Sequence, residues 1–524
     1  MSVFSVTVGN CRYWCAMLIL ALALGGCATR LPQAPERVSS SAFDKPQDTE
    51  LGRFFQPELA AHPEKSGVAM ITTSEWGFRT RAGLANMAEK TLDVQYYIWE
   101  GDMTGKILAE RLLQAADRGV RVRMLLDDIN TEDTDFRLAR MDEHPNIEIR
   151  LFNPFASRSS RMSEFVFNLD QLNYRMHNKA YIADNALAIV GGRNIGDDYF
   201  GVDSVANFRD LDLAIAGPAV KEVSHSFDQY WNSELAVPVS ALESEKVSKQ
   251  ELKAEKAALY RWVEELEDYP YPIDSTSDAL FEKLLVFKDH FFWSSVEILY
   301  DQPDKLESRE EEVADELRYE GQFKQHEILM EVAYLVPGPQ ELENARINNE
   351  RGIHQRILTN SLATNDVAAA HAGYAKYRRQ LVRSGVDIYE FRPDASSERK
   401  AWSLLAGRSR ASLHTKAFVQ DRETVAIGSF NLDPRSISLN TELVILVHNP
   451  GLAREVAEYM ETGVLPENSY HVILETDKET GSERLVWITE KDGREVRYYS
   501  DPDVGFGRRF SAWFMGLLPI EEHL

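Results

Sequence analysis

The sequence contains one eight-residue pattern twice: a histidine, a lysine two positions later and an aspartate five positions after the lysine. The two copies are His177, Lys179 and Asp184, and His414, Lys416 and Asp421. After each aspartate come six residues, a pair of small residues and, two positions beyond that pair, Asn194 or Asn431. Two copies of the same set predict one active site built from two halves, with two imidazoles facing one phosphate.

These residue types suit the cleavage of a phosphodiester. A neutral histidine can attack phosphorus, and a protonated histidine can supply the proton that the leaving oxygen needs. The two lysines and the amides of Asn194 and Asn431 can hold the phosphoryl oxygens. No metal or other cofactor is expected, because this chemistry requires none and no metal-ligand cluster lies beside the motifs.

The carboxylates near the motifs allow more than one interpretation. Asp184 and Asp421 lie an odd number of positions from the histidine and lysine, so they are either reacting groups or turn formers and salt-bridge partners. Each histidine also needs a carboxylate to orient it. Asp212 and Glu442 stand at equivalent places before an apolar strand, and Asp210 is the rival candidate in the first half.

The segments that must position these residues also repeat. Apolar alternation and helical periodicity predict strands and helices in the same order in both halves, which indicates an α/β fold with a mostly parallel or mixed sheet in each. In the first half we expect strands at 91–99, 120–126, 146–152, on both sides of Asp184 and at 211–216, with helices at 104–118 and 218–231. In the second half we expect strands at 330–336, 357–361, 386–391, around Asp421 and at 442–447, with a helix at 366–383.

The length and charge of the chain bound its organisation and its partners. At 524 residues it is too long for one simple core. The formal net charge of -25 argues against nucleic acid as a partner, although a small basic pocket for one phosphate is compatible with it. The predicted units are a leader at 1–26, a tether at 27–65, a first domain at 66–239, a helical and acidic insertion at 240–325, a second domain at 326–465 and a C-terminal extension at 466–524.

The N-terminus predicts a lipid anchor. An apolar run at 16–24 is too short to span a bilayer comfortably but suits a signal peptide, and Leu24-Gly25-Gly26-Cys27 resembles a bacterial lipobox. Cys27 would then become the first residue of the mature chain and carry acyl groups. Ala28 in place of an aspartate favours the outer over the inner membrane, so the protein is expected in the cell envelope, facing the periplasm. An uncleaved signal anchor and an ordinary signal peptide are the alternatives.

Two further segments carry weaker signals. The acidic stretch at 301–320 is expected to be a solvated helix or loop. The aromatic, apolar stretch at 510–520 is expected to pack on the body, with contact to a lipid surface as the alternative.

The doubled motif resembles the signature of the phospholipase D superfamily, and both copies match it without substitution. The similarity covers roughly residues 66–465. The stretches LDVQYYIW, RMHNKAYIADNALAIVGGRNIGDDYF and LTNSLATNDVAAAHAGYAKYRRQL, with the closing LLPIEEHL, are similar to the cardiolipin synthase-like branch of bacteria, most of all its C type. The resemblance implies two phospholipase D-like α/β/α sandwich domains related by a pseudo-twofold axis, with the active site at their interface.

The resemblance also implies a double displacement through a phosphohistidine. His177 would be the nucleophile and His414 the acid and base, with Asp212 orienting His177 and Glu442 orienting His414. The implied reaction transfers a phosphatidyl group between phospholipids and forms cardiolipin at a membrane surface. Hydrolysis of phospholipid to phosphatidic acid is the first alternative, phosphodiesterase or nuclease activity is disfavoured by the charge, and a non-catalytic envelope lipoprotein that binds lipid is the alternative from a different class.

Overall fold

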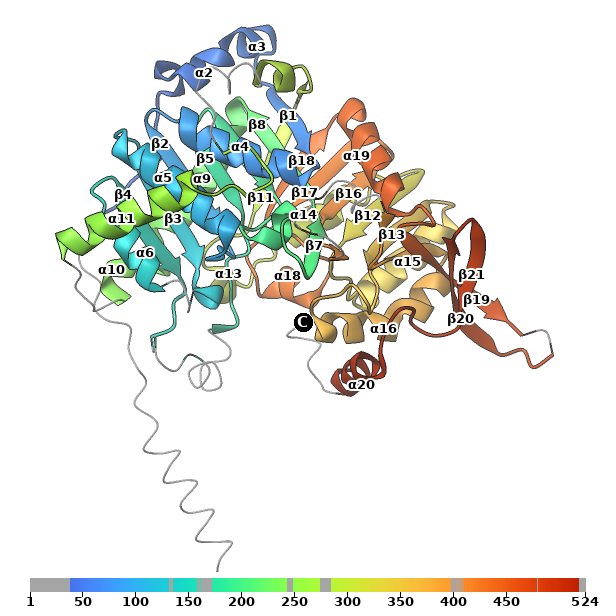
Figure 1. Cartoon of the computed structure of the whole chain (residues 1–524). Helices are drawn as coiled ribbons and strands as arrows, with labels where there is room; N and C mark the ends of the chain where they lie inside the picture. Colours follow the sequence, from blue (N-terminus) through green and yellow to red (C-terminus); the bar gives the residue numbers. More distant parts are fainter. Residues whose placement is uncertain are drawn as a thin grey trace, which may run out of the picture.

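A computed structural model of the chain has two α/β lobes that lie side by side, the first coloured blue to green and the second yellow to red in Figure 1. The structure describes residues 38–131, 135–156, 158, 161, 172–242, 248–273, 284–396, 402, 406, 409–477 and 479–517. The predicted leader and its Cys27 lie outside these residues.

The first lobe is built on a nine-stranded sheet in the order β10-β1-β8-β6-β5-β2-β3-β4-β9. Strands β2, β3 and β4 are parallel, and the others pair antiparallel, so the sheet is mixed. The strands are β1 (Ser66–Ile71), β2 (Thr91–Tyr96), β3 (Arg121–Asp127), β4 (Ile147–Phe152), β5 (Ala180–Ala183), β6 (Leu187–Gly191), β8 (Asp212–Ala216), β9 (Ala236–Pro238) and β10 (Phe292–Ser294).

The second lobe repeats this arrangement in a ten-stranded sheet. Its order, β11-β18-β17-β16-β12-β13-β14-β19-β20-β21, matches the first sheet strand for strand from β1 to β9. The strands are β11 (Val296–Tyr300), β12 (Glu327–Val332), β13 (His354–Asn360), β14 (Val386–Phe391), β16 (Lys416–Gln420), β17 (Thr424–Gly428), β18 (Leu443–His448), β19 (Ser469–Thr476), β20 (Glu483–Lys491) and β21 (Arg494–Tyr498). The predicted fold of two related α/β domains is confirmed.

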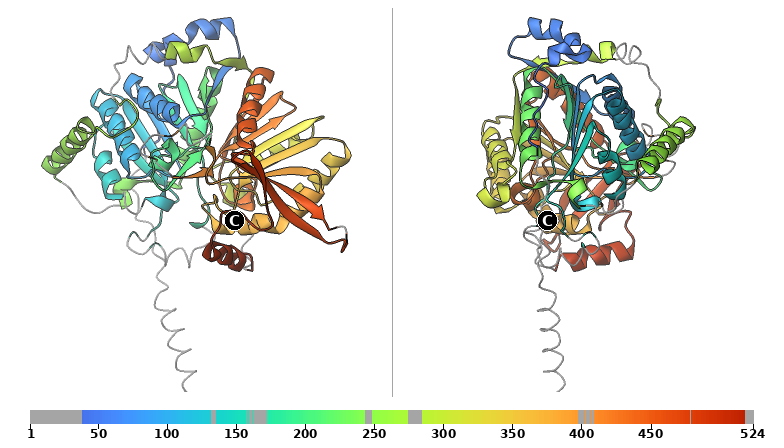
Figure 2. Two further views of the ribbon diagram at one scale, coloured as in Figure 1. Left: turned by 45° about the vertical axis from the view of Figure 1, so that its right-hand side comes forward. Right: turned by 90° about the vertical axis from the view of Figure 1, so that its left-hand side faces the viewer.

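Helices cover the outer faces of both sheets, as Figure 2 shows. In the first lobe and the segments before and after it they are η1 (Pro46–Asp48), α2 (Glu50–Phe54), α3 (Gln56–Ala61), α4 (Ser74–Met87), α5 (Met103–Asp117), η2 (Asp128–Asn130), α6 (Asp135–Asp142), η3 (Asp197–Phe200), α9 (Pro218–Asn232), α10 (Val239–Leu242) and α11 (Lys249–Glu264). In the second lobe they are α13 (Lys305–Ser308), α14 (Glu312–Glu320), α15 (Pro339–Glu350), α16 (Ala368–Arg383), α18 (Pro434–Ser438), α19 (Pro450–Gly463) and α20 (Phe506–Met515). None of the helices described by the structure is long and apolar enough to cross a membrane.

Local sequence signals explain several helix boundaries. Ser248 and Glu251 form the reciprocal capping box that opens α11. The start of α5 differs from the expectation, because Asp102 rather than Thr104 caps the helix by accepting the backbone N–H of Gly105. The Thr104 hydroxyl instead donates to Asp197.

One hydrophobic core joins the two lobes. It contains apolar side chains of the adjoining sheets together with those of α9 and α19, including Val190, Phe227, Ile445 and Val456, all of which are buried. Strand β6 of the first lobe packs against β17 and β18 of the second. Burial of this shared apolar surface holds the lobes in one fixed relation, which a site built from both of them requires.

The described structure divides the chain differently from the predicted ranges. Part of the expected tether folds, because Leu51 and Phe55 bury in the first core and Phe55 packs on Phe291 at a ring distance of 5.6 Å. The expected insertion supplies β10 to the first sheet and β11 to the second, and the C-terminal extension adds β19, β20 and β21. These differences arise because segments far apart in the sequence pair in one sheet, and local sequence patterns do not predict such pairing.

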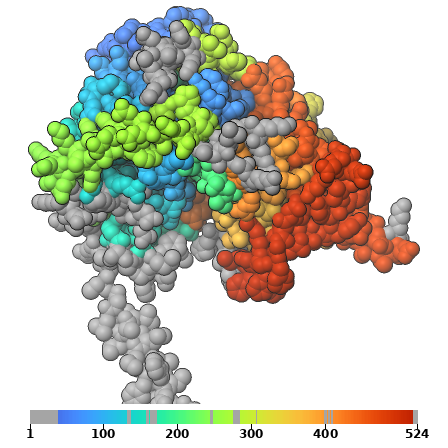
Figure 3. All heavy atoms as spheres, viewed as in Figure 1, coloured from blue at the N-terminus to red at the C-terminus, as the bar shows by residue number. Residues whose placement is uncertain are grey.

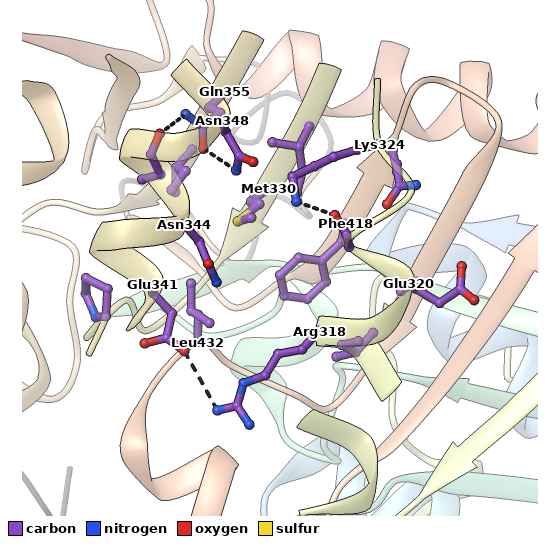
Figure 4. A pocket seen from close by; sticks show the side chains of 18 of the residues that line it. Arg318, Glu320, Lys324, Met330, Glu341, Asn344, Asn348, Gln355, Phe418 and Leu432 are labelled. Atoms are coloured by element: carbon purple, nitrogen blue, oxygen red, sulfur yellow. Dashed lines mark hydrogen bonds and ion pairs between the residues drawn. The ribbon is translucent and has the colours of Figure 1, made fainter. Parts of the chain in front are cut away.

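The acidic stretch at 301–320 is partly buried, and the helix layer of the second lobe differs from that of the first. Asp301 is buried and forms an ion pair with Lys305, 2.9 Å between Oδ2 and Nζ. Helix α14 follows and is shorter than α4, its counterpart in chain order, 9 residues against 14. A largely apolar cavity of about 180 Å³ lies beside it, with the Arg318 and Glu341 ion pair at one side (Figure 4).

Candidate active site

The two motif histidines lie where the lobes meet, and each is held by a carboxylate of the opposite lobe. His177 Nδ1 lies 2.9 Å from Oε2 of Glu442, and His414 Nδ1 lies 2.7 Å from Oδ2 of Asp210. Both imidazoles and both carboxylates are buried. With Nδ1–H donating to the carboxylate, the lone pair of Nε2 is left on the other side of each ring, where it can act as nucleophile or base.

Backbone contacts across the interface fix these crossed pairs. The N–H of His177 donates to the carbonyl of Thr441, the residue before Glu442, at 2.9 Å. The N–H of His414 donates to the carbonyl of Arg209, the residue before Asp210, at 2.8 Å. The second contact continues as a two-stranded parallel sheet of β7 (Ala206–Arg209) and β15 (Arg410–Leu413).

The predicted partners of the histidines are therefore wrong in two respects. Glu442 orients His177 rather than His414, and Asp212 orients neither histidine. Asp212 instead binds the guanidinium groups of Arg81 and Arg193, each 3.0 Å from its Oδ2, in a fully buried cluster. The rival candidate Asp210 has the orienting position.

The small pair in each motif packs closely against the segment that carries the orienting carboxylate. A Cβ on Gly192 would lie 2.2 Å from Oδ1 of Asp210, and one on Gly191 would lie 2.3 Å from Oδ1 of Asp212. In the second copy the hydroxyl of Ser429 accepts the N–H of Leu443, the residue after Glu442, at 2.9 Å. The small pair at this spacing therefore helps to position the strand that carries the carboxylate. The sequence did not reveal this role.

The two motif lysines are buried beside their histidines, just before and at the start of β5 and β16. Lys179 Nζ and Lys416 Nζ each donate to the carbonyl of the histidine two residues earlier, at 2.5 Å in both copies. Lys179 lies over the ring of Tyr97 at 5.5 Å, and Lys416 lies over that of Tyr334 at 6.0 Å. Such rings hold an ammonium group without neutralising it, so both charges stay available to an anion.

Electrostatic interactions in the site extend from each lobe to the other. Burial, Lys179 and Lys416 all lower the pKa of His177 well below its ordinary value. Burial and the two lysines likewise lower the pKa of His414 to about 4, against the opposing effect of Asp210. Since each lysine acts on the histidine of the other lobe as well as on its own, the four side chains share one site.

The lysines and carboxylates are shifted in the same environment. Burial lowers the pKa of Lys179 to about 7 and that of Lys416 to about 8, although nearby carboxylates oppose the shift. Burial raises the pKa of Glu442 to about 7. Burial also opposes ionisation of Asp210, but the charge and hydrogen bond of His414 outweigh it and hold the pKa at about 2. Burial therefore disfavours the charged forms of the lysines and histidines, and a bound phosphate anion would stabilise these positive charges.

The two asparagines occupy equivalent places at the edge of the site. Oδ1 of Asn194 accepts the N–H of Ile98 at 3.2 Å, and Oδ1 of Asn431 accepts the N–H of Tyr334 at 3.3 Å. Nδ2 of Asn194 also donates to the hydroxyl of Tyr199 at 3.0 Å. Because the oxygens are engaged, only the amide N–H groups can face a phosphate, and phosphate binding by the asparagines stays a prediction.

The motif aspartates lie away from the site, in tight turns. Asp184 and Asp421 have left-handed backbones, with φ of 53° and 52°. Asp184 accepts three backbone N–H groups, those of residues 89–91, at 2.7–3.0 Å, and Asp421 accepts those of residues 325–327 at 2.8 Å. The prediction that they react is wrong, and the turn-former interpretation holds.

Aromatic side chains that the sequence analysis did not single out enclose the histidines. The ring of Tyr97 lies 5.0 Å from His177 in an edge-on arrangement. The rings of Tyr199 and Phe208 each lie 5.1 Å from His414. They leave His177 and His414 only 6% and 4% exposed. Tyr97 stands in the predicted strand at 91–99, but nothing in that pattern indicated that its end reaches the site.

Comparison with known proteins agrees with this geometry. The family described as "Cardiolipin synthase, PLD-like domain" matches residues 83–231 and 322–463. The chain is 35% identical to cardiolipin synthase C of Escherichia coli (strain K12), over 89% of this chain and 98% of the relative. It is 23% identical to cardiolipin synthase A of Pseudomonas aeruginosa, over 75% of this chain and 66% of the relative. The crystal structure of phosphatidylserine synthase from Haemophilus influenzae Rd KW20 has the same fold, with a TM-score of 0.50 at 13% identity over 80% of this chain and 92% of that one.

Replacing Asp184 by alanine should destabilise the chain without removing a reacting group. Three buried or half-buried N–H groups lose their acceptor, at a cost on the order of 2–4 kcal/mol. Denaturant titration measures the loss. The matched variant Asp421→Ala should cost less, because that turn is more exposed. Loss of turnover in Asp184→Ala with unchanged stability would contradict this role.

The specificity constant kcat/KM for a soluble p-nitrophenyl phosphodiester, whose leaving group needs no proton from His414, should fall as the pH rises above about 7. Lys179 and Lys416 lose their charge as the pH rises through about 7 and about 8 in the free enzyme, and anion binding weakens. The decline should approach roughly tenfold per pH unit for each lysine required. A pH–rate profile checks this, and kcat should decline less, because bound phosphate favours the charged lysines. A flat kcat/KM across this range would contradict it.

Proposed function

Because this chain belongs to the cardiolipin synthase family of phospholipase D-like proteins, we propose that it transfers a phosphatidyl group from one phospholipid to the hydroxyl of another and forms cardiolipin. The observation that carries the proposal is the pair of crossed histidine–carboxylate contacts, His177 with Glu442 and His414 with Asp210. They give one buried site two imidazoles that are held through Nδ1, which leaves Nε2 as the reacting atom, and two lysines flank them. This set suits a double displacement at phosphorus.

In the first step, Nε2 of His177 attacks phosphorus. The N–P bond forms, the bond from phosphorus to the leaving oxygen breaks, and His414 gives its proton to that oxygen. In the second step, His414 takes the proton from the acceptor hydroxyl. The new O–P bond forms and the N–P bond breaks, which restores both histidines.

The electrostatics support this division of roles. The pKa of His177 lies far below its ordinary value, so His177 is neutral and can attack. His414 pairs with Asp210, whose pKa of about 2 keeps the carboxylate ionised. An ionised partner favours the protonated imidazole once a phosphodiester anion offsets the charge of Lys179 and Lys416. Substrate binding would thereby supply the proton that the first step consumes.

The enclosure of the histidines supports transfer over hydrolysis. Tyr97, Tyr199 and Phe208 pack on the two imidazoles and leave little surface for water. A phosphohistidine that is shielded from water survives until an alcohol arrives. The acceptor would therefore be a lipid hydroxyl rather than water.

We further propose that acylated Cys27 anchors the protein to the outer membrane, facing the periplasm. The lipobox-like Leu24-Gly25-Gly26-Cys27 and the absence of an aspartate at Ala28 support this. Cys27→Ser should abolish incorporation of labelled fatty acid into the protein and move it out of the outer-membrane fraction. Unchanged labelling would contradict the proposal.

Expression in a bacterial strain that lacks cardiolipin synthases tests the function. The unmutated chain should restore cardiolipin in the lipid profile, and His177→Ala and His414→Ala should not, because each removes one of the two imidazoles. Phosphatidic acid without cardiolipin would favour hydrolysis. An unchanged profile with the unmutated chain confirmed as expressed would contradict enzymatic activity on phospholipid.

A substrate whose leaving group needs no proton separates the two histidines within the same set of variants. With a p-nitrophenyl phosphodiester, His414→Ala should still release one equivalent of nitrophenol in a burst, whereas His177→Ala should release none. The reverse result would exchange the two roles and leave the double displacement intact.

A further inference from the structure

Helix α20 turns its apolar face away from the protein. Phe506, Phe510, Trp513, Phe514 and Leu517 recur at helical spacing and are 85%, 54%, 60%, 50% and 63% exposed. The inner face carries small residues, since Ala512 is buried and Gly516 lies against α16. An amphipathic helix on a globular protein normally buries its apolar face, and no other described helix exposes as many large apolar side chains.

The helix is nevertheless held firmly in place by the segment before it. Oδ1 of Asp501 binds Arg378 at 2.9 Å, and Asp503 binds Tyr470 at 2.5 Å and Lys491 at 3.3 Å. These contacts attach the start of α20 to the second lobe. The exposed aromatic face is therefore presented in a fixed direction. Figure 3 shows the red C-terminal part of the described chain at the lower edge of the molecule.

A short series of contacts connects the helix to the candidate active site. Arg508 donates to the carbonyl of Asn365. The neighbouring carboxylate of Asp366 accepts the hydroxyl of Tyr334 at 2.8 Å, and the ring of Tyr334 lies over Lys416. Three contacts thus lead from α20 to a motif lysine, and Figure 2 shows the helix at one end of the molecule, below the two sheets.

The helix itself carries positive charge, unlike the chain as a whole. The helix contains Arg508 and Arg509 and no acidic residue, although the chain carries a net charge of -25. A hollow of about 450 Å³ beside the helix is lined by Arg410, Lys491 and Arg508 and by the carboxylates of Asp394 and Asp503. Asp394 forms an ion pair with Arg392, and Asp503 forms one with Lys491. Neither the Arg410 nor the Arg508 guanidinium forms an ion pair with a carboxylate of the described residues. Burial first and the charge of Arg410 second lower the pKa of Arg508, against the opposing charge of Asp366.

We propose that α20 docks the active site on a bilayer that contains anionic phospholipid. The aromatic face enters the boundary between headgroups and acyl chains, where Trp and Phe are favoured, and Arg410 and Arg508 contact lipid phosphate. This extends the proposed function, because it specifies how a buried site reaches substrates that reside in a membrane. It is separate from the anchor at Cys27, which tethers the chain but does not orient the site.

The charge pattern favours a bilayer over a second copy of the chain as the occupant of this face. A strongly acidic protein is repelled by an anionic surface, so contact requires a local region of positive charge next to the apolar one. The arginines supply that region and the aromatic face supplies the apolar area. A second copy would bring its own two arginines against these and add repulsion.

Insertion is measured with an environment-sensitive fluorophore on the full chain. Because all three cysteines lie at or before residue 27, Cys11, Cys15 and Cys27 are replaced by serine, and Trp513→Cys or the control Tyr319→Cys receives the label. With vesicles of phosphatidylethanolamine and phosphatidylglycerol, the label at 513 should shift to the blue and be quenched by brominated acyl chains. The label at 319 should do neither. A label at 513 that stays in water overturns the proposal, whether or not the chain turns over substrate.

Activity gives the second readout. Phe510→Ser with Trp513→Ser should lower turnover on vesicles on the order of tenfold and leave turnover of a monomeric short-chain phospholipid unchanged. The control Tyr319→Ser with Phe323→Ser also removes two exposed aromatic rings, both 52% exposed, and should change neither. Equal losses on both substrates, or a dimer in sedimentation that buries the label at 513, would overturn docking. Inactivity of the unmutated chain on both substrates would refute the proposed function and leave the insertion measurement to decide docking.

Discussion

The crossed contacts between histidine and carboxylate depend on the packing of the two lobes, and the site depends on those contacts. Each imidazole takes its orientation from a group more than 200 residues away, 265 positions for His177 and Glu442 and 204 for His414 and Asp210. Neither lobe contains a complete half-site by itself. The shared apolar core therefore does more than stabilise the fold, because any shift between the lobes would separate both pairs at once.

The same packing creates the electrostatic state of the site. Two lysines and two histidines are removed from water at one place, so burial lowers the pKa of all four, and repulsion by a neighbouring lysine adds to the shift of Lys179 and of both histidines. A phosphodiester anion between them lowers the free energy of the charged lysines and of one charged histidine. Substrate binding is thereby linked to protonation of one histidine, so the general acid forms when substrate is bound rather than before.

Substrate must still reach this buried site, and α20 is the element that we propose brings the site to the membrane. The sequence predicts that the aromatic C-terminal stretch packs on the body, and α20 does so through Ala512, its small neighbours and Arg508 but not through its large apolar side chains. Its large side chains are exposed, and its Arg508 contacts Asn365, the neighbour of the Asp366 that binds Tyr334. A rigidly attached apolar face that is connected to a buried phosphate site by a few contacts fits an enzyme whose substrates stay in a membrane.

The sequence by itself determined the chemistry and the architecture: the repeated His177, Lys179, His414 and Lys416, the two α/β halves and the family all follow from local spacing and periodicity. Tertiary structure alone decided that Glu442 faces His177, that Asp212 serves an arginine cluster instead, and that 296–300 joins the second sheet. The physical reason is that periodicity records which residues share one helix or strand, whereas pairing across the interface depends on how two sheets pack. No local pattern carries that information.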